Sequence, residues 1–105
     1  MAQDTRQDEF WCKIFQTKYD LVVAICDSKL LGRRIDFKGV KVKLSEEFYG
    51  GKSIDQQTAL KLLQKASIAN LFGKQIVKLA LRHGFVERKN ILLIQGQPHA
   101  QVVKL

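Results

Sequence analysis

Apolar and polar residues follow distinct patterns along the chain, and each pattern predicts an element. Two apolar runs flank the polar residues "TKYD" at 17–20, which predicts a β-hairpin over residues 10–26. Because nearly every position of both runs is apolar, we expect both strands to be central to a sheet or covered on both faces. Residues 40–44 read "VKVKL", the period-two pattern of a strand with one buried face and one basic face exposed to water.

The turn of this hairpin decides where the two cysteines lie. A two-residue turn at Tyr19 and Asp20 would pair Cys12 with Asp27 and put the thiols on opposite faces of the sheet. A turn one residue different would place Cys12 directly opposite Cys26, and the sequence leaves both registers open. The spacing of the cysteines fits neither a metal knuckle nor a redox pair, so we expect reduced, packed thiols.

Two helices are predicted in the second half of the chain. Ser53, followed three residues later by Gln56, forms a capping box, and the helix should continue through "DQQTALKLLQKASIANL" to residue 71. The amphipathic pattern "FGKQIVKLALRHG" at 72–84 predicts a second helix, with Gly84 as its C-terminal stop.

Asn70 lies at the junction between the two predicted helices. Its side chain should cap the second helix, because an asparagine at a helix start accepts hydrogen bonds from free backbone amides. The alternative is a ligand site, in which the Asn70 amide group acts beside the free backbone amides of Leu71 to Gly73.

The C-terminal part of the chain combines an apolar strand with a polar run. The sequence "NILLIQ" at 90–95 predicts a strand, and its four consecutive apolar residues indicate that both faces are covered. The run "GQPHAQ" at 96–101 contains the single proline of the chain and predicts a loop that holds His99 outside the core. The "VVKL" segment can continue the sheet after this loop.

The order of these elements, β-β-β-α-α-β, predicts an α+β fold. We expect a two-layer sandwich, a mainly antiparallel sheet with two helices packed on one face. A chain of 105 residues suits one domain, which we place at residues 10–105 after a disordered N-terminal arm at 1–9. The apolar runs are too short to span a membrane and the charged N-terminus is unlike a signal peptide, so we expect a cytoplasmic protein with no membrane contact.

The charge of the chain points to a polyanionic partner. The net charge is +8 and the pI is about 9.7, which in a small cytoplasmic domain favours binding to nucleic acid. The alternative is a basic surface that only keeps the protein in solution. The expected phosphate contacts come from one strand and two helices: Lys41, Lys43, Lys61, Lys65, Lys74, Lys78 and Arg82.

Four motifs, taken together, resemble a known family. In order along the chain they are "CDSKLLGR", "SEEFYGG", "ASIANLFGKQIVKLALRHGFV" and "GQPHAQ". This combination is similar to the small archaeal family filed as domain of unknown function 424, over residues 11–101. The resemblance implies a two-layer α/β sandwich in an archaeal cytoplasm and implies no activity.

Three polar, glycine-containing segments are candidates for a binding surface. We predict that "EFYGG", "NLFG" and "GQPHAQ" meet at one edge of the sheet, with Tyr49 and His99 stacking on or hydrogen bonding to a ligand. If the segments are scattered, each is only a turn. The candidate residues are Tyr49, Gly50, Gly51, Asn70, Gly73, Gln97, His99 and Gln101.

Three classes of function compete on these observations. We favour a basic RNA-binding protein, associated with the ribosome or translation, without catalytic activity. The second class is a small hydrolase-like enzyme that uses His99 with Tyr49 or with Glu46 and Glu47. The third is a protein adaptor that docks through Phe48 and Phe72. We expect no cofactor and no metal site, and the oligomeric state stays open.

Overall fold

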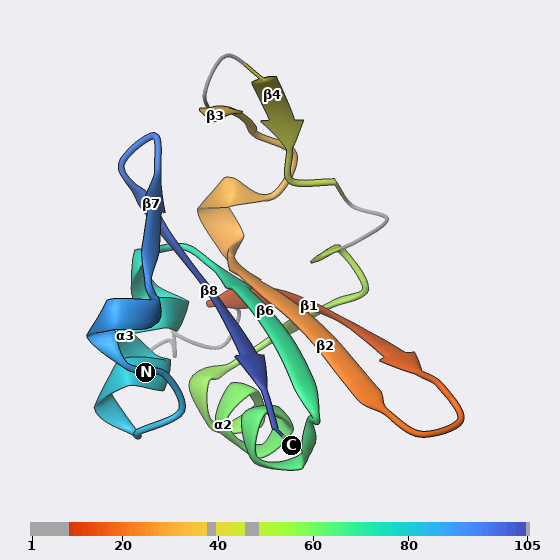
Figure 1. Ribbon diagram of the computed structural model, residues 1–105. Coiled ribbons are helices and arrows are strands. Elements are labelled where there is room, and N and C mark those ends of the chain that lie inside the picture. Colours follow the sequence, from red (N-terminus) through yellow and green to blue (C-terminus); the bar gives the residue numbers. More distant parts are fainter. Residues whose placement is uncertain (1–8, 38–39, 46–48, 105) are drawn as a thin grey trace, which may run out of the picture.

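Strands that are distant in the sequence form the main sheet of the protein. The structure is a computed structural model that describes residues 9–37, 40–45 and 49–104. In this part of the chain, one sheet has the strand order β5-β1-β2-β6-β8-β7, and β3 and β4 form a separate hairpin (Figure 1). In chain order the elements are β1 (Phe10–Gln16), β2 (Leu21–Asp27), the 3-10 helix η1 (Ser28–Leu30), β3 (Arg34–Phe37), β4 (Val40–Lys43), β5 (Lys52–Ile54), α2 (Gln56–Lys65), β6 (Ile68–Phe72), α3 (Lys74–Arg82), the 3-10 helix η2 (Arg88–Asn90), β7 (Leu92–Ile94) and β8 (Gln97–Val103).

The two α-helices pack on the same face of this sheet. Residues of α2 and α3 share one apolar cluster with β1, β2, β6 and β8. The strands pair antiparallel except β2 and β6, which are parallel. The prediction of a two-layer α+β sandwich with a mainly antiparallel sheet is therefore confirmed. No helix in the described residues has the length and apolar character needed to cross a membrane.

The predicted hairpin is confirmed, but its register differs from both alternatives. Cys12 lies opposite Ile25, and Trp11 lies opposite Cys26. A longer loop causes the difference, because the Thr17 amide donates to the Asp20 carbonyl at 2.8 Å and leaves four residues between the strands. The two thiols belong to clusters on opposite faces of the sheet.

The first helix begins and ends differently from its prediction. Its N-cap is Asp55, whose carboxylate accepts a hydrogen bond from the Thr58 amide at 2.9 Å. Ser53 instead lies in β5, where it pairs with Trp11, so the capping box was wrong. The helix ends at Lys65, since residues 68–72 form β6.

The wrong helix end has a physical cause. β6 is a central strand between β2 and β8, and a short run that is apolar at most positions has no periodicity to separate strand from helix. Ser67 fixes the change of direction, because its hydroxyl donates to Asp20 Oδ1 at 2.9 Å and accepts from the Leu21 amide at 3.0 Å.

The second predicted helix is confirmed in its central part. α3 spans Lys74–Arg82, and Gly84 follows it with a φ of +80°, the left-handed conformation expected of a C-terminal glycine. Phe72, the first residue of the prediction, is instead the last residue of β6.

The C-terminal strands form a hairpin that the sequence described only in part. Gln95 and Gly96, both with positive φ, make a tight turn between β7 and β8. The predicted loop at 96–101 is therefore mostly strand, and "VVKL" continues it as expected through residue 103. β7 lies at the edge of the sheet, and its side chains Leu92 and Leu93 are 49% and 66% exposed, so complete coverage of this strand was wrong.

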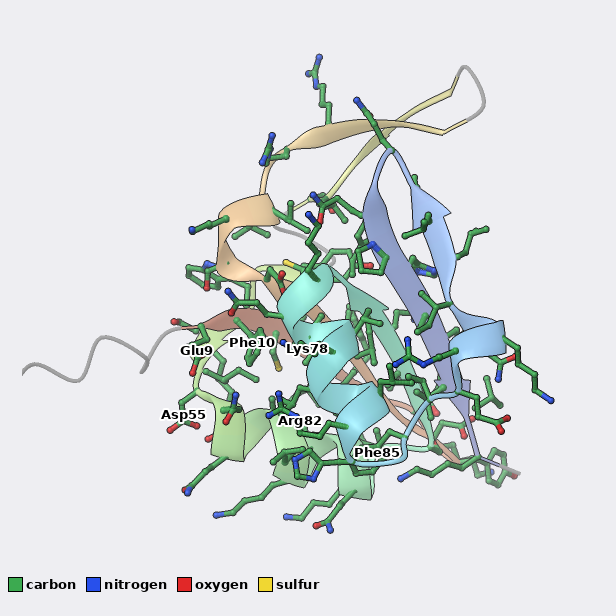
Figure 2. The ribbon with its side chains drawn as sticks, turned by 90° about the vertical axis from the view of Figure 1, so that its left-hand side faces the viewer. Glu9, Phe10, Asp55, Lys78, Arg82 and Phe85 are labelled. Atoms are coloured by element: carbon green, nitrogen blue, oxygen red, sulfur yellow. The ribbon has the colours of Figure 1, made fainter. Side chains whose placement is uncertain are left out.

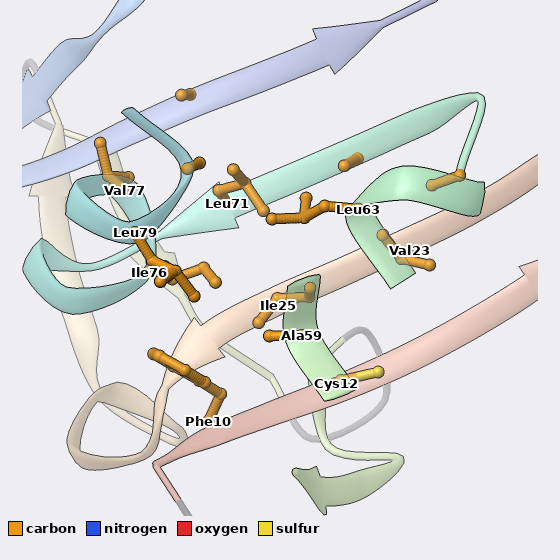
Figure 3. Packing of buried hydrophobic residues seen from close by; sticks show 14 of the residues in the cluster. Phe10, Cys12, Val23, Ile25, Ala59, Leu63, Leu71, Ile76, Val77 and Leu79 are labelled. Carbon is orange, nitrogen blue, oxygen red and sulfur yellow. The ribbon is translucent and has the colours of Figure 1, made fainter. Parts of the chain in front are cut away.

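The larger apolar core lies between the sheet and the helices. Figure 3 shows Ile25 and Leu71 of the sheet facing Leu63 of α2 and Ile76 of α3. Each of these four side chains is at most 1% exposed, and full burial of one such side chain contributes about 1.5–3 kcal/mol. This cluster holds the two layers together.

A smaller cluster covers part of the opposite face. Leu30 of η1, Leu44 and Tyr49 pack with Cys26 and Phe72. The chain reaches this position because the Ser28 amide donates to the carbonyl of Glu9 at 3.1 Å, which joins the start of the domain to η1. Residues 1–8 of the predicted arm lie outside the described residues.

Candidate functional site

The outer surface of the two helices is basic. Neither α2 nor α3 contains an acidic residue, and the two helices carry five exposed cations: Lys61, Lys65, Lys74, Lys78 and Arg82. None of the five forms an ion pair with a residue that the structure describes. The predicted phosphate contacts of the helices therefore lie on one layer of the molecule with their charges available.

The cations of α3 form a stripe. Lys74, Lys78 and Arg82 recur every four residues, so their Cα atoms follow each other about 6 Å apart along the helix. Figure 2 shows Lys78 and Arg82 on α3, with Glu9 and Asp55 beyond them, near the start of α2. The stripe presents three positive charges in one direction.

A groove runs between α3 and the first turn of α2. Its volume is about 350 Å³, and it is lined by Glu9, Gln56, Gln75, Lys78, Leu79 and Arg82. The glutamine amides can donate and accept hydrogen bonds, and the two cations outnumber the single carboxylate of Glu9. The groove is therefore suited to polar, anionic groups.

The N-terminus of α3 is occupied by a side chain of the protein itself. Asp27, at the end of β2, accepts hydrogen bonds from the backbone amides of Gln75 and Ile76, both at 2.9 Å. Burial raises the pKa of this carboxyl group, and its hydrogen bonds with the helix amides oppose that rise. The ligand hypothesis named the amides of Leu71 to Gly73, and these do not lie at a free helix start, because Leu71 and Phe72 belong to the paired strand β6.

Gly73 fits tightly against the same carboxylate. Its φ is +124°, and a Cβ atom added there would lie 2.4 Å from Cγ of Asp27. Its amide donates to the Pro98 carbonyl at 2.9 Å. The glycine thus allows close approach of the chain to itself, not of a ligand.

Asn70 does not cap α3, which corrects the prediction. It lies in the middle of β6, opposite Ala24 on one side and Gln101 on the other. Asp27, a residue distant in sequence, supplies the cap. The error follows from the wrong helix end, because a helix that stopped at residue 71 would have left Asn70 beside the next one.

Tyr49 lies in the smaller buried cluster, and the two following glycines lead from it to β5. Tyr49 is 6% exposed, and burial, with a further contribution from Cys26, raises its pKa. A Cβ atom on Gly51 would lie 2.6 Å from the Cys12 carbonyl oxygen, so Gly51, just before β5, lets the chain lie close to β1. Gly50 is half-buried between them.

The predicted meeting of the three segments at one edge does not occur. β5, which follows "EFYGG", lies at one end of the sheet, and three strands separate it from β8. Of the residues of "EFYGG" that the structure describes, Tyr49 connects the two regions, because its ring is buried in the same cluster as Phe72. The "NLFG" and "GQPHAQ" segments do meet, because β6 and β8 are paired.

His99 lies in β8, and not in a loop. It is half-buried opposite Phe72, with ring centroids 5.2 Å apart and an interplanar angle of 66°. Burial lowers the pKa of its imidazole. Gln101, two residues further along the same face, is exposed. Gln97 instead lines a small hollow of about 80 Å³ with Arg33 and Arg34.

Several other predicted residues can be placed only in part. Lys41 and Lys43 lie on β4, in the separate hairpin, and their side chains lie outside the description. Glu46, Glu47 and Phe48 fall outside the described residues. Phe72 is 3% exposed, so the docking role that the adaptor hypothesis gave it is wrong.

The two cysteines are buried and lie in separate clusters. Burial is the main cause that raises both thiol pKa values, for Cys26 to about 12 with Asp27 contributing. They are therefore protonated near neutral pH and unreactive as nucleophiles. Among the described residues, no three His, Cys, Asp or Glu side chains are grouped to hold a metal ion.

Sequence reasoning missed one group of half-buried residues, on β1. Trp11, Lys13 and Phe15 alternate along the strand and share the face away from the helices, since their partners Cys26, Ala24 and Val22 do so. The alternation in "WCKIF" was a usable signal. It was hidden by Cys12 and Ile14, which make the run look apolar on both faces.

These features describe a basic α+β sandwich with a mixed sheet and both helices on one face. The family model described as Protein of unknown function (DUF424) matches residues 15–105, so the chain belongs to this family, and the resemblance seen in the sequence is confirmed. The crystal structure of an uncharacterized conserved protein from Methanopyrus kandleri is similar, with a TM-score of 0.77 and 27% identity, covering 91% of this chain and 93% of that one. No curated protein matches the chain.

Proposed function

We propose that this protein is a cytoplasmic RNA-binding protein, associated with the ribosome or another structured RNA, and that it performs no catalysis. The outer surface of α2 and α3 would contact phosphates. The observation that carries the proposal is the combination of five exposed cations with no acidic residue on either helix. Contacts of this kind supply affinity without reading sequence.

The arrangement of the cations works against helix stability. Like charges four residues apart, such as Lys61 and Lys65 or Lys74 and Lys78, destabilise a helix by about 0.2–0.5 kcal/mol per pair. Lys74 also lies in the first turn of α3, where the helix dipole disfavours a cation. A surface that only kept the protein in solution would not need these unfavourable positions, so they support a role in binding.

Three carboxylates of the described residues serve the fold. Asp27 and Asp55 cap helices, and Asp20 accepts a hydrogen bond from the Ser67 hydroxyl. The one ion pair within the described residues joins Lys89 and Glu87 at 3.8 Å, and both side chains are exposed. The basic surface is therefore not neutralised from within.

The experiment is a salt titration of binding to a fluorescently labelled RNA hairpin. Wild-type protein is compared with the variant Lys74→Gln, Lys78→Gln, Arg82→Gln at salt concentrations from about 50 to 200 mM. We expect the variant to bind more weakly. The slope of log affinity against log salt should become shallower by about 2 to 3, because three phosphate contacts are lost.

A matched variant removes three positive charges elsewhere, with Lys29→Gln, Lys52→Gln and Arg88→Gln. All three side chains are exposed and lie outside α2 and α3. This matched variant should keep the wild-type slope of log affinity against log salt. Equal losses in both variants would contradict binding by the helix surface, and a wild-type protein that does not bind the hairpin at low salt would contradict the proposed function.

A further inference from the structure

Among the described residues, the face of the sheet opposite the helices is covered most closely at one end. Residues that lie opposite one another on neighbouring strands form rows across this face. The first row, which includes Cys26 and Phe72, lies under Leu30 and Tyr49. The next two rows are partly or fully exposed apart from Ala24: Lys13, Ala24, Asn70 and Gln101, then Phe15, Val22, Ile68 and Val103. We name Lys13, Phe15, Ile68, Asn70 and Gln101 the open face.

The two rows differ in chemistry. One row brings the amides of Asn70 and Gln101 side by side on paired strands, and both groups can donate and accept hydrogen bonds. The other row is apolar and includes the Phe15 ring, which is half-buried against the smaller cluster and has Lys13 Nζ 5.9 Å from its centroid. Bases need this pair of features, a ring to stack on and polar groups for their edges.

The hairpin tip extends the same chemistry. Tyr19 is 84% exposed, and Lys18 Nζ lies 5.4 Å from the centroid of its ring. The nearby carboxylate of Asp20 is held by the Ser67 hydroxyl at 2.9 Å. Aromatic rings and cations therefore alternate from β1 into the turn.

We propose that the open face binds unpaired bases of single-stranded RNA, with Phe15 and Tyr19 as stacking platforms and Asn70 and Gln101 as partners for base edges. This inference rests on the proposed function and names the RNA segment that the protein recognises. β1, β2, β6 and β8 span about 14 Å across the sheet at the usual strand spacing. A sheet of four strands is wide enough for two or three stacked bases in known RNA-binding folds.

Charge favours RNA over a protein as the occupant. A protein interface has an apolar centre depleted of charge, whereas here Lys13 and the two amides occupy the row between the covered cluster and the apolar row. Lys13 and Lys18 can attract phosphates, and binding through them weakens with salt. The helix surface lies on the other side of the sheet, so the two surfaces can be altered separately.

The test compares a labelled single-stranded oligonucleotide with an RNA duplex of the same length. Phe15→Leu and Tyr19→Leu keep apolar side chains and remove the rings. We expect each to weaken binding of the single strand by on the order of 10- to 100-fold, since stacking on one aromatic side chain contributes about that factor. Binding of the duplex should change less than twofold, because the helix surface is intact.

Two controls separate stacking from loss of fold. Phe15→Tyr keeps a ring and should keep wild-type affinity. Phe85→Leu removes a half-buried ring that packs on the helix side of the sheet, near Lys104, and should leave affinity for the single strand unchanged. Thermal melts of all variants report whether the fold is intact.

The outcomes distinguish this proposal from the proposed function. If Phe15→Leu and Tyr19→Leu bind the single strand as well as the wild type does, the open face is not a base-binding surface, although the protein binds RNA. If the wild type binds neither RNA, both proposals are overturned. Equal weakening of duplex and single strand by Phe15→Leu would also overturn the stacking role.

Discussion

The two faces of the sheet differ in how completely they are covered. On the helix side, Val23, Ile25 and Leu71 are fully buried along the central strands. On the opposite side, coverage falls from Cys26, which is fully buried, to Val103, which is 53% exposed. The comparison teaches that burial on the helix side supplies most of the stability. The less covered rows of the opposite face are those that we propose to bind RNA.

The largest effect is expected in the core under the helices. Leu71→Ala should lower the free energy of unfolding by about 2–5 kcal/mol, because it leaves a cavity among buried side chains. Ile68→Ala on the same strand removes a half-exposed side chain of the open face and should lower it by about half as much or less. Urea unfolding measures both. Equal losses would show that the two faces do not differ in stability.

The next effect concerns the junction that positions α3. Gly73→Ala should lower the free energy of unfolding by about 1–3 kcal/mol, because alanine is strained at its positive φ and its Cβ would displace Asp27. Gly84→Ala is the matched control: φ is also positive, but no atom lies within 4 Å of the added Cβ. Gly84→Ala should lower the free energy of unfolding by only about 1 kcal/mol. A loss at Gly84 as large as at Gly73 would contradict the role of Asp27.

This junction also shows what the sequence could and could not predict. Gly84 was found from the sequence because a helix stop depends on neighbouring residues only. The cap of α3 was not found from the sequence, because Asp27 and Ile76 are 49 residues apart. They meet only through the parallel pairing of β2 with β6. Local patterns predicted the hairpin and the centres of both helices, whereas long-range pairing determined where β6 begins.

The cap itself gives a third prediction. Asp27→Ala should lower the free energy of unfolding by about 1–2 kcal/mol, because it leaves the Gln75 and Ile76 amides without their acceptor. Asp55→Ala removes the carboxylate that accepts from the Thr58 amide of α2. It should lower the free energy of unfolding by less. Thermal denaturation followed by circular dichroism measures the order. A larger loss at Asp55 would show that α3 is not fastened mainly through Asp27.

The basic surface of the helices should show smaller effects of opposite sign. Lys74→Gln should raise the free energy of unfolding by about 0.3–1 kcal/mol, because it removes a cation from the first turn of α3. Lys65→Gln should lower it by a similar amount, because Lys65 lies in the last turn of α2. Chemical denaturation at low salt measures both. A Lys74 variant less stable than the wild type would remove the argument that this position serves binding.

The smallest effect is a pH dependence at the border of the open face. Burial lowers the pKa of His99 below its ordinary value of 6.5, so the unfolded chain binds a proton more readily than the folded chain does. Stability from this residue is therefore complete above about pH 6.5 and declines as pH falls below it. His99→Gln should flatten the dependence of the free energy of unfolding on pH between about 5 and 7. An unchanged slope would mean that His99 is not held neutral by the fold.

The candidate site was less predictable than the fold. The helix cations were identified from charge and amphipathic pattern, because exposed positions of a helix follow from its period. Asn70, His99 and Gln101 were identified as polar candidates, but Asn70 was assigned to a helix junction and the other two to a loop. Lys13 and Phe15 were missed, since Cys12 and Ile14 hid the alternation of β1 and since the exposure of a strand face depends on how far η1 and Tyr49 extend over the sheet.

The most direct test is an NMR titration of isotopically labelled protein with a short single-stranded RNA at low salt. The account predicts that backbone amide signals shift along α3 and at Lys13, Phe15, Asn70 and Gln101, while those of the exposed edge strand β7 do not. Shifts confined to β7, or no shifts at saturating RNA, would contradict the claim that the open face and the helix surface bind RNA.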